Sequence, residues 1–230
     1  MAASIGDSGP YTGVVTPGGV PDVRELAGLV LTKVSVDPQM HNSCYLLRCR
    51  ATGEQLLVDA AAEGPRLLEV VGSAGLSRLV TTHQHWDHHR ALAEVAGATG
   101  AVVVVGEDDA DAVTEQTGVR VDDRVRDGDT VEIGEVRLEV IHLEGHTPGS
   151  IALLYDDPEG SPHLWTGDSL FPGGPGRTTA PGDFDSLMAD LQAKVFDRLP
   201  DETWFYPGHG GDSTLGAERA SIPEWLERRW

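Results

Sequence analysis

Short apolar or alternating runs, separated by Pro, Asn and Gly, dominate the first half of the chain and predict β-strands. The predicted strands are residues 28–36, 44–49, 55–60, 76–83 and 101–106. The last of these is an unbroken β-branched run, typical of a strand buried on both faces. Helices are predicted over residues 64–75 and 87–100, and the second begins at Asp and ends at Gly.

The second half of the chain repeats this theme. Its predicted strands are residues 129–143 (two strands joined by a Gly turn), 150–157, 161–171 and 202–210, the last ending in a loop. Residues 183–199 predict an amphipathic helix, because apolar side chains recur three and four positions apart. These are Phe184, Leu187, Leu191, Val195 and Leu199. The pattern therefore predicts an α/β fold in which two sheets pack together with helices outside.

Length and composition narrow the class of protein. The 230 residues suit a single domain over 1–230, and the Gly/Pro-rich residues 1–25 predict a loosely ordered arm. No apolar stretch of about 18 residues and no signal-peptide pattern is present, so neither membrane insertion nor export is predicted. A formal charge of −20 disfavours a nucleic-acid partner, which requires clustered Lys and Arg.

The two cysteines, Cys44 and Cys49, lie five positions apart in one predicted strand. Strand geometry places their side chains on opposite faces, so no disulfide between them is expected. A reduced, cytoplasmic protein is the simplest interpretation. Two of the histidines, His41 and His163, are expected at the surface or in loops.

The segment "TTHQHWDHHRALA", residues 81–93, carries the strongest chemical signal in the sequence. His83, His85, Asp87 and His88 follow a predicted strand and precede a predicted helix. Imidazole and carboxylate groups are suitable ligands for zinc, iron or manganese. Packing does not readily explain this density of such groups in one loop, and the segment therefore predicts a metal site.

Three later residues share the context of a Gly-rich loop next to a strand. They are His146 in "LEGHTPGS", Asp168 in "WTGDSLF" and His209 in "YPGHG". Glycine allows the backbone to approach an ion closely. Each motif alone is a weak signal, whereas their order and spacing after the first motif are highly specific.

Together, "HQHWDH", "GHTPGS", "GDSLFPGGPGR" and "PGHG" resemble the metallo-β-lactamase superfamily, and most closely its glyoxalase II-type hydrolases. The resemblance runs from about residue 41 to near the C-terminus. It implies an αββα sandwich with a two-metal site at the sheet edges. It also implies that His83, His85 and His146 hold one metal, that Asp87, His88 and His209 hold the other, and that Asp168 bridges both.

The chemistry implied by this resemblance is hydrolysis. Two divalent ions, most simply zinc with iron or manganese as alternatives, lower the pKa of a water to give a bridging hydroxide. This hydroxide attacks the carbonyl of a small thioester substrate, and the metals stabilise the resulting oxyanion. Asp87 is predicted to be both a ligand and the catalytic residue that orients the nucleophile.

Three further residues are candidate substrate contacts. His89 stands where the resembling hydrolases commonly carry a small residue, and it is predicted to lie at the pocket edge or to support a ligand rather than bind metal. Trp86 could line the pocket or pack in the core. Arg177, in "GPGRTT", could brace its loop or contact the substrate.

Several alternatives remain open at this stage. A single-iron persulfide dioxygenase would use only His83, His146 and Asp168 on the same fold. A lactonase or β-lactamase-like hydrolase would use the same ligand set, whereas a non-catalytic binding module would be expected to lack ligands. Glyoxalase II has a helical glutathione-binding region after the sandwich, and this chain has only about twenty residues after His209, so glutathione specificity is not implied.

Overall fold

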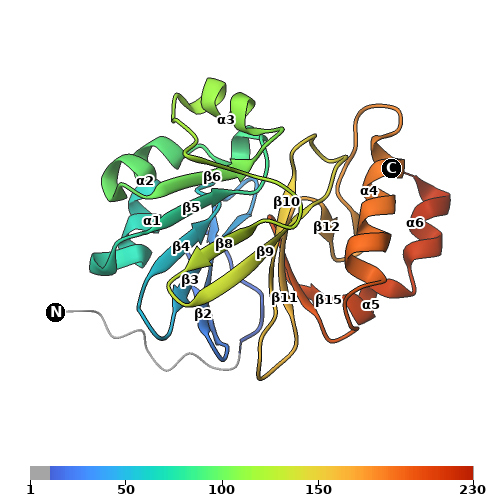
Figure 1. The fold of residues 1–230 in the computed structure, drawn as a ribbon, viewed down its shortest axis with the longest axis horizontal. Helices are drawn as coiled ribbons and strands as arrows, with labels where there is room; N and C mark the ends of the chain where they lie inside the picture. Colours follow the sequence, from blue (N-terminus) through green and yellow to red (C-terminus); the bar gives the residue numbers. More distant parts are fainter. Residues whose placement is uncertain (1–10, 230) are drawn as a thin grey trace.

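Residues 11–229 are described by the computed structural model, in which two mixed β-sheets face each other (Figure 1). The first is seven-stranded, in the order β1-β2-β3-β4-β5-β6-β7. Its strands are β1 (Asp22–Glu25), β2 (Leu29–Val36), β3 (Asn42–Cys49), β4 (Gln55–Val58), β5 (Arg78–Thr81), β6 (Val102–Gly106) and β7 (Asp123–Val125). Pairing is antiparallel from β1 to β4 and parallel from β4 to β7.

The second sheet is six-stranded, in the order β15-β14-β11-β10-β9-β8. Its strands are β8 (Thr130–Ile133), β9 (Val136–His142), β10 (Ile151–Tyr155), β11 (His163–Gly167), β14 (Trp204–Pro207) and β15 (Ser213–Thr214). Among the strands of this sheet within residues 11–229, β11 and β14 alone pair in parallel, so their carboxyl ends lie at the same edge. A small separate ribbon joins β12 (Leu170–Phe171) to β13 (Gly174–Pro175).

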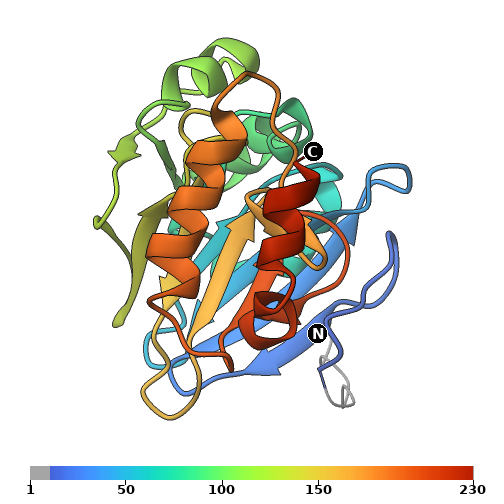
Figure 2. The same ribbon diagram turned by 90° about the vertical axis from the view of Figure 1, so that its right-hand side faces the viewer.

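Helices cover the outer face of each sheet (Figures 1 and 2). The first sheet carries α1 (Gly64–Val71), α2 (Leu92–Thr99) and α3 (Ala110–Thr117), with short 3₁₀ turns at Gly72–Ala74 and Trp86–His88. The second carries α4 (Asp183–Asp190), which continues as a π-helical segment (Leu191–Phe196), and α5 (Leu215–Arg219) and α6 (Ile222–Arg228). This αββα layering confirms the predicted architecture.

The layers are held together by three apolar clusters. The cluster between the sheets joins Leu31 and Leu47 of the first sheet to Val140, Leu153 and Trp165 of the second. The other two lie between each sheet and its helices. Full burial of one such side chain contributes roughly 1.5–3 kcal/mol, so these clusters dominate the folding energy.

The two cysteines lie on opposite faces of β3, as predicted. Cys44 belongs to the cluster beneath the helices, and Cys49 to the cluster between the sheets. Both thiols are free and buried.

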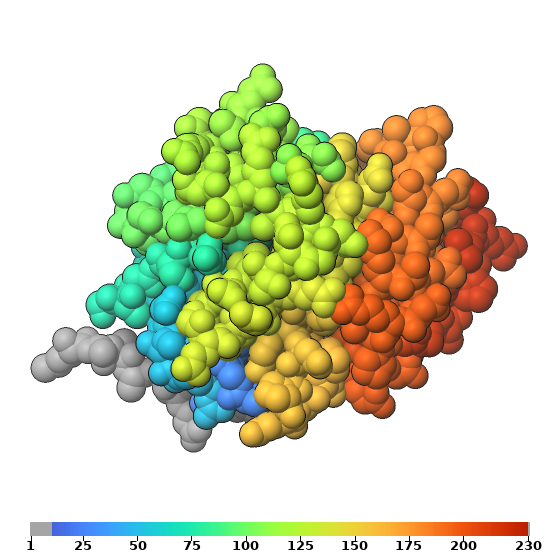
Figure 3. All heavy atoms as spheres, in the orientation of Figure 1, coloured from blue at the N-terminus to red at the C-terminus, as the bar shows by residue number. Residues whose placement is uncertain are grey.

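In space-filling view, the yellow-green residues of the β8–β9 hairpin lie between the green and orange parts of the chain (Figure 3).

Among the differences between the observed and the predicted elements, three concern the loop of His83, the helices of the first sheet and the N-terminal residues. The helix predicted over 87–100 begins only at Leu92, because residues 86–88 form a 3₁₀ turn held by contacts of the site described below. Helix α3 was not predicted, since only Ala110 and Val113 of its eight residues are buried. Residues 22–25, predicted as part of the arm, form β1 against β2, whereas residues 1–10 lie outside the described range.

Burial tests the predicted positions of two histidines. His163 lies in β11 and is 1% exposed, so its predicted surface position was wrong. His41 is exposed, as expected. Within residues 11–229, no helix has the length and apolarity that crossing a membrane would require.

Candidate metal centre

The loops that carry the predicted ligands meet at one edge of the sandwich, where strands of both sheets end. His83 follows β5, Asp168 follows β11 and His209 follows β14, while His146 lies in the β9–β10 connection. Two backbone contacts join the sheets here. The backbone N–H of Ile151 donates to the carbonyl of Thr82 at 2.9 Å, and an isolated β-bridge links Asn42 to His209.

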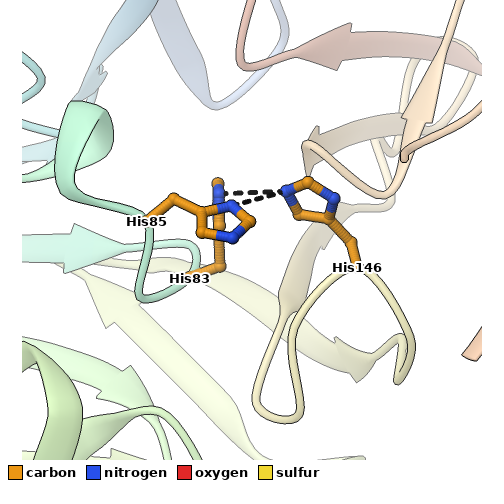
Figure 4. A group of neighbouring side chains, drawn as sticks. All are labelled: His83, His85 and His146. Atoms are coloured by element: carbon orange, nitrogen blue, oxygen red, sulfur yellow. Dashed lines mark hydrogen bonds between the residues drawn. The ribbon is translucent and has the colours of Figure 1, made fainter. Parts of the chain in front are cut away.

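Three of the predicted ligands form a compact group, His83, His85 and His146 (Figure 4). The Nε2 atom of His146 lies 2.9 Å from Nδ1 of His85 and 3.3 Å from Nε2 of His83. Two imidazoles from one loop thus converge with a third from a loop about sixty positions away, as a cation site requires.

A second group consists of Asp87, His88 and His209. The Nε2 atom of His209 lies 3.2 Å from Nε2 of His88 and 3.3 Å from Oδ2 of Asp87. Since all three side chains present ligand-type atoms to a common point, this group could hold a second ion.

Asp168 lies between the two groups. Its Oδ1 atom is 3.3 Å from Nε2 of His88, while its Oδ2 atom is 3.4 Å from His209 Nε2 and 3.8 Å from His146 Nε2. Asp168 also forms a potential ligand group with His83 and His88. The structure therefore brings all seven predicted ligand residues into one cluster.

For His83, His85, His146 and Asp168, electrostatics favour the protonation states that bind metals. Burial and the neighbouring His88 hold the pKa of His83 well below its usual value, and burial also lowers the pKa of His85 and His146. Burial raises the pKa of Asp168, but His88 and His209 outweigh it and hold the net pKa well below the usual value. Neutral imidazoles and an ionised carboxylate are ready to act as ligands.

At His209, in the second group, a metal ion must compete with a proton. Burial lowers its pKa, but hydrogen bonds to Asp168 and Asp87 reverse this effect and raise the pKa to about 9. A metal ion arriving at this group must therefore displace a proton at neutral pH.

Two features of the chain fit a bound cation. Oδ1 of Asp168 is buried without a well-aligned hydrogen bond, although buried polar atoms are usually satisfied. A Cβ atom on Gly208 would lie 2.2 Å from that oxygen and 2.5 Å from Cε1 of His88, so only glycine allows the loop to pass this close. Mixed imidazole and carboxylate donors suit zinc, iron or manganese.

Asp59, which was not predicted from the sequence, holds His88 and Thr82 in place. Its Oδ2 atom lies 2.8 Å from Nδ1 of His88 and accepts a hydrogen bond from the Thr82 hydroxyl, while Oδ1 accepts from the Thr82 backbone N–H. This fixes Nδ1 of His88 as the donor and leaves Nε2 free to face the cluster. The available signal was an Asp directly after an apolar strand.

Asp109, also missed, joins the loops of the first group. Its Oδ2 atom accepts from the backbone N–H of Gln84 at 2.8 Å and from the Thr147 hydroxyl at 2.6 Å. Its Oδ1 atom accepts from the N–H of Gly149 at 2.8 Å. One buried carboxylate thus fixes the loop of His83 and His85 relative to that of His146.

Asn42 and Arg90 support Asp87. The side-chain amide of Asn42 donates to Oδ2 of Asp87 at 3.0 Å, and the guanidinium of Arg90 contacts Oδ1 of Asn42 at 3.4 Å. Arg90 is itself paired with Asp37 at 2.6 Å. Asp87 is therefore held by a chain of polar contacts that starts at the β2–β3 loop.

The three predicted substrate contacts lie around the cluster in different ways. His89 is buried and its Nε2 atom donates to the carbonyl of Gln84 at 3.1 Å, so it supports the loop. Trp86 is 54% exposed, which excludes core packing, and lines a pocket of about 440 Å³ with His89 and Arg90. Arg177 contributes its carbonyl, 2.7 Å from Nδ1 of His146, while its side chain is exposed.

A helix–sheet–sheet–helix sandwich with a histidine and aspartate cluster at the sheet edges defines a class of metal-binding proteins. In agreement, the family model described as "Metallo-beta-lactamase superfamily" matches residues 37–209. The chain belongs to the metallo-beta-lactamase superfamily.

Curated relatives named hydroxyacylglutathione hydrolase include one from Polaromonas sp. and one from Rhodospirillum rubrum. The one from Polaromonas sp. is 32% identical over 79% of this chain and 66% of its own length. The one from Rhodospirillum rubrum is 35% identical over 73% of this chain and 62% of its own length. The chain thus spans a little under two thirds of the length of these relatives.

Solved structures with similar folds include two whose identity to this chain is close to that of the relatives. The crystal structure of ETHE1 from Myxococcus xanthus has a TM-score of 0.72 and 29% identity, covering 84% of this chain and 83% of that one. The crystal structure of TTHA1623 in a di-iron-bound form has a TM-score of 0.66 and 30% identity, covering 84% and 98%.

Proposed function

We propose that this protein is a metal-dependent hydrolase that cleaves a small thioester into a carboxylic acid and a thiol. The observation that carries the proposal is the convergence of seven ligand residues into two adjacent groups that share Asp168. The relatives named hydroxyacylglutathione hydrolase support a thioester as the substrate class. The proposal does not specify the thiol part of the substrate.

The residues divide naturally between two ions. His83, His85 and His146 would hold one, while Asp87, His88 and His209 would hold the other. Zinc suits these donors best, with iron or manganese as alternatives. Bound cations of this kind lower the pKa of water and polarise a carbonyl, so the protein needs no serine or cysteine nucleophile.

The protein's own contribution is orientation. Asp87 stays ionised because hydrogen bonds from His209 and Asn42 outweigh its burial and hold its pKa below the usual value. An ionised carboxylate fixed in this way can accept a hydrogen bond from the attacking water and aim it at the carbonyl carbon. Asp59 and Asn42 keep His88 and Asp87 in place, so that little reorganisation is needed during the reaction.

The test is thiol release by the zinc-loaded protein across a panel of S-lactoyl and other acyl thioesters, with a lactone and a β-lactam included. Asp87→Ala should keep the circular dichroism spectrum and reduce turnover by roughly 10²–10⁴-fold, the contribution typical of a positioned acid or base. Glu54→Ala, in the exposed turn between β3 and β4, is the control and should keep full activity. No thiol release from any thioester by fully loaded protein would refute the proposal.

A single-iron dioxygenase acting on a persulfide is the second candidate. His83, His146 and Asp168 alone could hold one iron, and the similarity to the ETHE1 structure keeps this alternative open. The additional presence of His85, Asp87, His88 and His209 in ligand positions favours the two-metal hydrolase. Counting metals per chain, together with oxygen consumption in the presence of a persulfide, separates the two.

A further inference from the structure

Lys33, in the middle of β2, is fully buried, which is rare for lysine. Its ammonium group has three acceptors: Oδ1 of Asp212 at 2.5 Å, the carbonyl of Gly210 at 2.7 Å and the carbonyl of Gly13 at 2.9 Å. An ammonium group has three donors, so each has a partner. One of these partners, Gly210, directly follows the candidate ligand His209.

The side chain of Asp212 is equally buried. Its Oδ2 atom accepts a hydrogen bond from the Tyr11 hydroxyl at 2.5 Å. The Tyr45 hydroxyl lies 3.4 Å from Oδ1 and donates to the carbonyl of Pro207 at 2.6 Å. Side chains from β2 and β3 therefore hold carbonyls on both sides of His209.

A contribution to stability alone is a weak explanation for this buried ion pair. Replacing such a pair with apolar residues is often neutral or stabilising, because desolvation offsets the attraction between the charges. The position of the ion pair, next to the loop of His209, indicates a role in holding that loop. The supports of the other ligands are different: Asp59 holds Thr82 and His88, and Asp109 holds the loops of His83, His85 and His146.

We propose that Lys33 and Asp212 are positioning residues that fix the His209 loop for the second metal ion. The carbonyl of Met40, 2.8 Å from Nδ1 of His209, sets the ring so that Nε2 faces Asp87 and Asp168. The ion pair fixes the backbone on which that ring stands. This inference rests on the proposed function only in requiring a second metal.

The experiment titrates zinc into metal-free protein and counts chains carrying none, one or two ions by native mass spectrometry. Lys33→Met should raise the dissociation constant of the second zinc on the order of tenfold to a hundredfold and leave that of the first unchanged. A Lys33→Met/Asp212→Asn double variant, which leaves no unpaired buried carboxylate, should show the same selective loss if Lys33→Met folds poorly.

Gln55→Met is the matched control. Gln55 is also buried, and its side chain holds two backbone carbonyls, those of Val71 and Gly75, which are remote from the ligands. This variant should bind both zinc ions as the wild type does. Equal weakening of both zinc sites in the double variant, or an unchanged second site, would overturn the inference.

Amide hydrogen exchange of the metal-free proteins gives an independent measurement. The double variant should exchange faster in residues 207–212 and at the wild-type rate in residues 82–89; uniform acceleration would indicate a merely structural role. A wild type that binds a single zinc would overturn this inference together with the two-metal proposal. A protein that binds two zinc ions selectively as described but cleaves no thioester would refute only the proposed function.

Discussion

Asp59 is a buried carboxylate that orients the candidate ligand His88 without being a ligand itself. It accepts from Nδ1 of His88 at 2.8 Å, so it selects the tautomer whose Nε2 atom faces the metal cluster. Asp59→Asn would place an amide donor or a neutral acceptor there and weaken that selection. We expect zinc affinity at the second group to fall about tenfold to a hundredfold, measured by zinc titration of the metal-free variant.

Asp157→Asn is the control for this prediction. Asp157 is likewise buried and accepts from the backbone N–H groups of Ala27 and Glu159, far from the ligand loops. Its replacement should leave zinc affinity unchanged. Equal affinities in the Asp59 variant and the wild type would mean that His88 does not depend on Asp59 for its tautomer.

His163 makes a separate prediction about pH. It lies in β11, with Nδ1 2.7 Å from the Tyr206 hydroxyl, and burial with the nearby Arg24 lowers its pKa to about 4. Between pH 6.5 and about pH 4 the unfolded chain binds a proton here that the folded chain does not. The contribution of His163 to stability therefore rises with pH across this window, by on the order of 3 kcal/mol in total.

His163→Phe removes this titration and keeps an aromatic ring beside Tyr155 and Tyr206. Urea unfolding of metal-free protein between pH 4.5 and pH 7 should show a smaller rise in unfolding free energy for the variant than for the wild type. Identical slopes would show that His163 is not the group responsible.

The sequence could identify ligands but not the residues that support them. His83, His85, Asp87 and His88 were recognisable because four ligand-type residues crowd into one loop, and His146, Asp168 and His209 because of their Gly-rich loops. Asp59 and Asp109 are single acids whose partners lie 23 to 40 positions away, and Lys33 meets Asp212 across 179 positions. Such pairing is created by the fold and leaves no local spacing to read.

At the scale of elements, Asp109 makes the start of α3 a junction between two loops. Asp109→Ala would leave the N–H groups of Gln84 and Gly149 and the Thr147 hydroxyl without this acceptor. We expect a loss of about 3 kcal/mol in unfolding free energy and weaker zinc binding at the group of His83, His85 and His146. Urea unfolding and zinc titration measure the two effects.

Asp108→Ala is the matched control, since Asp108 is the exposed neighbour on the same turn. It should change stability by no more than about 0.5 kcal/mol. If Asp109→Ala loses stability but binds the first zinc normally, the carboxylate is structural and does not align the two loops.

Elements were predictable where apolar periodicity was strong. The helix predicted over 183–199 corresponds to α4 and its π-helical continuation, which bury Phe184, Leu187, Leu191 and Val195. Helix α3 was not predicted because its pattern is mostly polar. The helix predicted to begin at Asp87 begins later because the side chains of His88 and His89 form hydrogen bonds to Asp59 and Gln84. Tertiary contacts override local pattern at the site itself.

At the scale of the molecule, the layering was predictable and the strand order was not. Two groups of strands with flanking helices imply two covered sheets. Nothing local in the sequence shows that β11 pairs in parallel with β14 about forty positions later, or that the two sheets join through Thr82 and Ile151. These pairings place ligands from both sheets at one edge.

That arrangement predicts the effect of metal removal on the whole fold. The candidate ligands follow β5 in the first sheet and lie next to β9, β11 and β14 in the second, so bound ions would link both sheets. A ligand at 100 times its dissociation constant stabilises the folded state by about 2.7 kcal/mol. Each kcal/mol shifts the Tm of a chain of this size by about 2–4 °C, so a chelator should lower the Tm by about 5–10 °C per ion lost.

Calorimetry of zinc-loaded, chelated and reloaded protein measures this effect, and reloading must restore the original Tm. Asp168→Asn tests its source, because Asp168 contacts both ligand groups. The variant should lose most of the zinc-dependent rise in Tm, since one amide oxygen replaces the carboxylate charge shared by the two sites. A zinc-dependent rise as large as that of the wild type would show that the stabilising ions bind elsewhere, and the sheet edge would then lose its assignment as the metal centre.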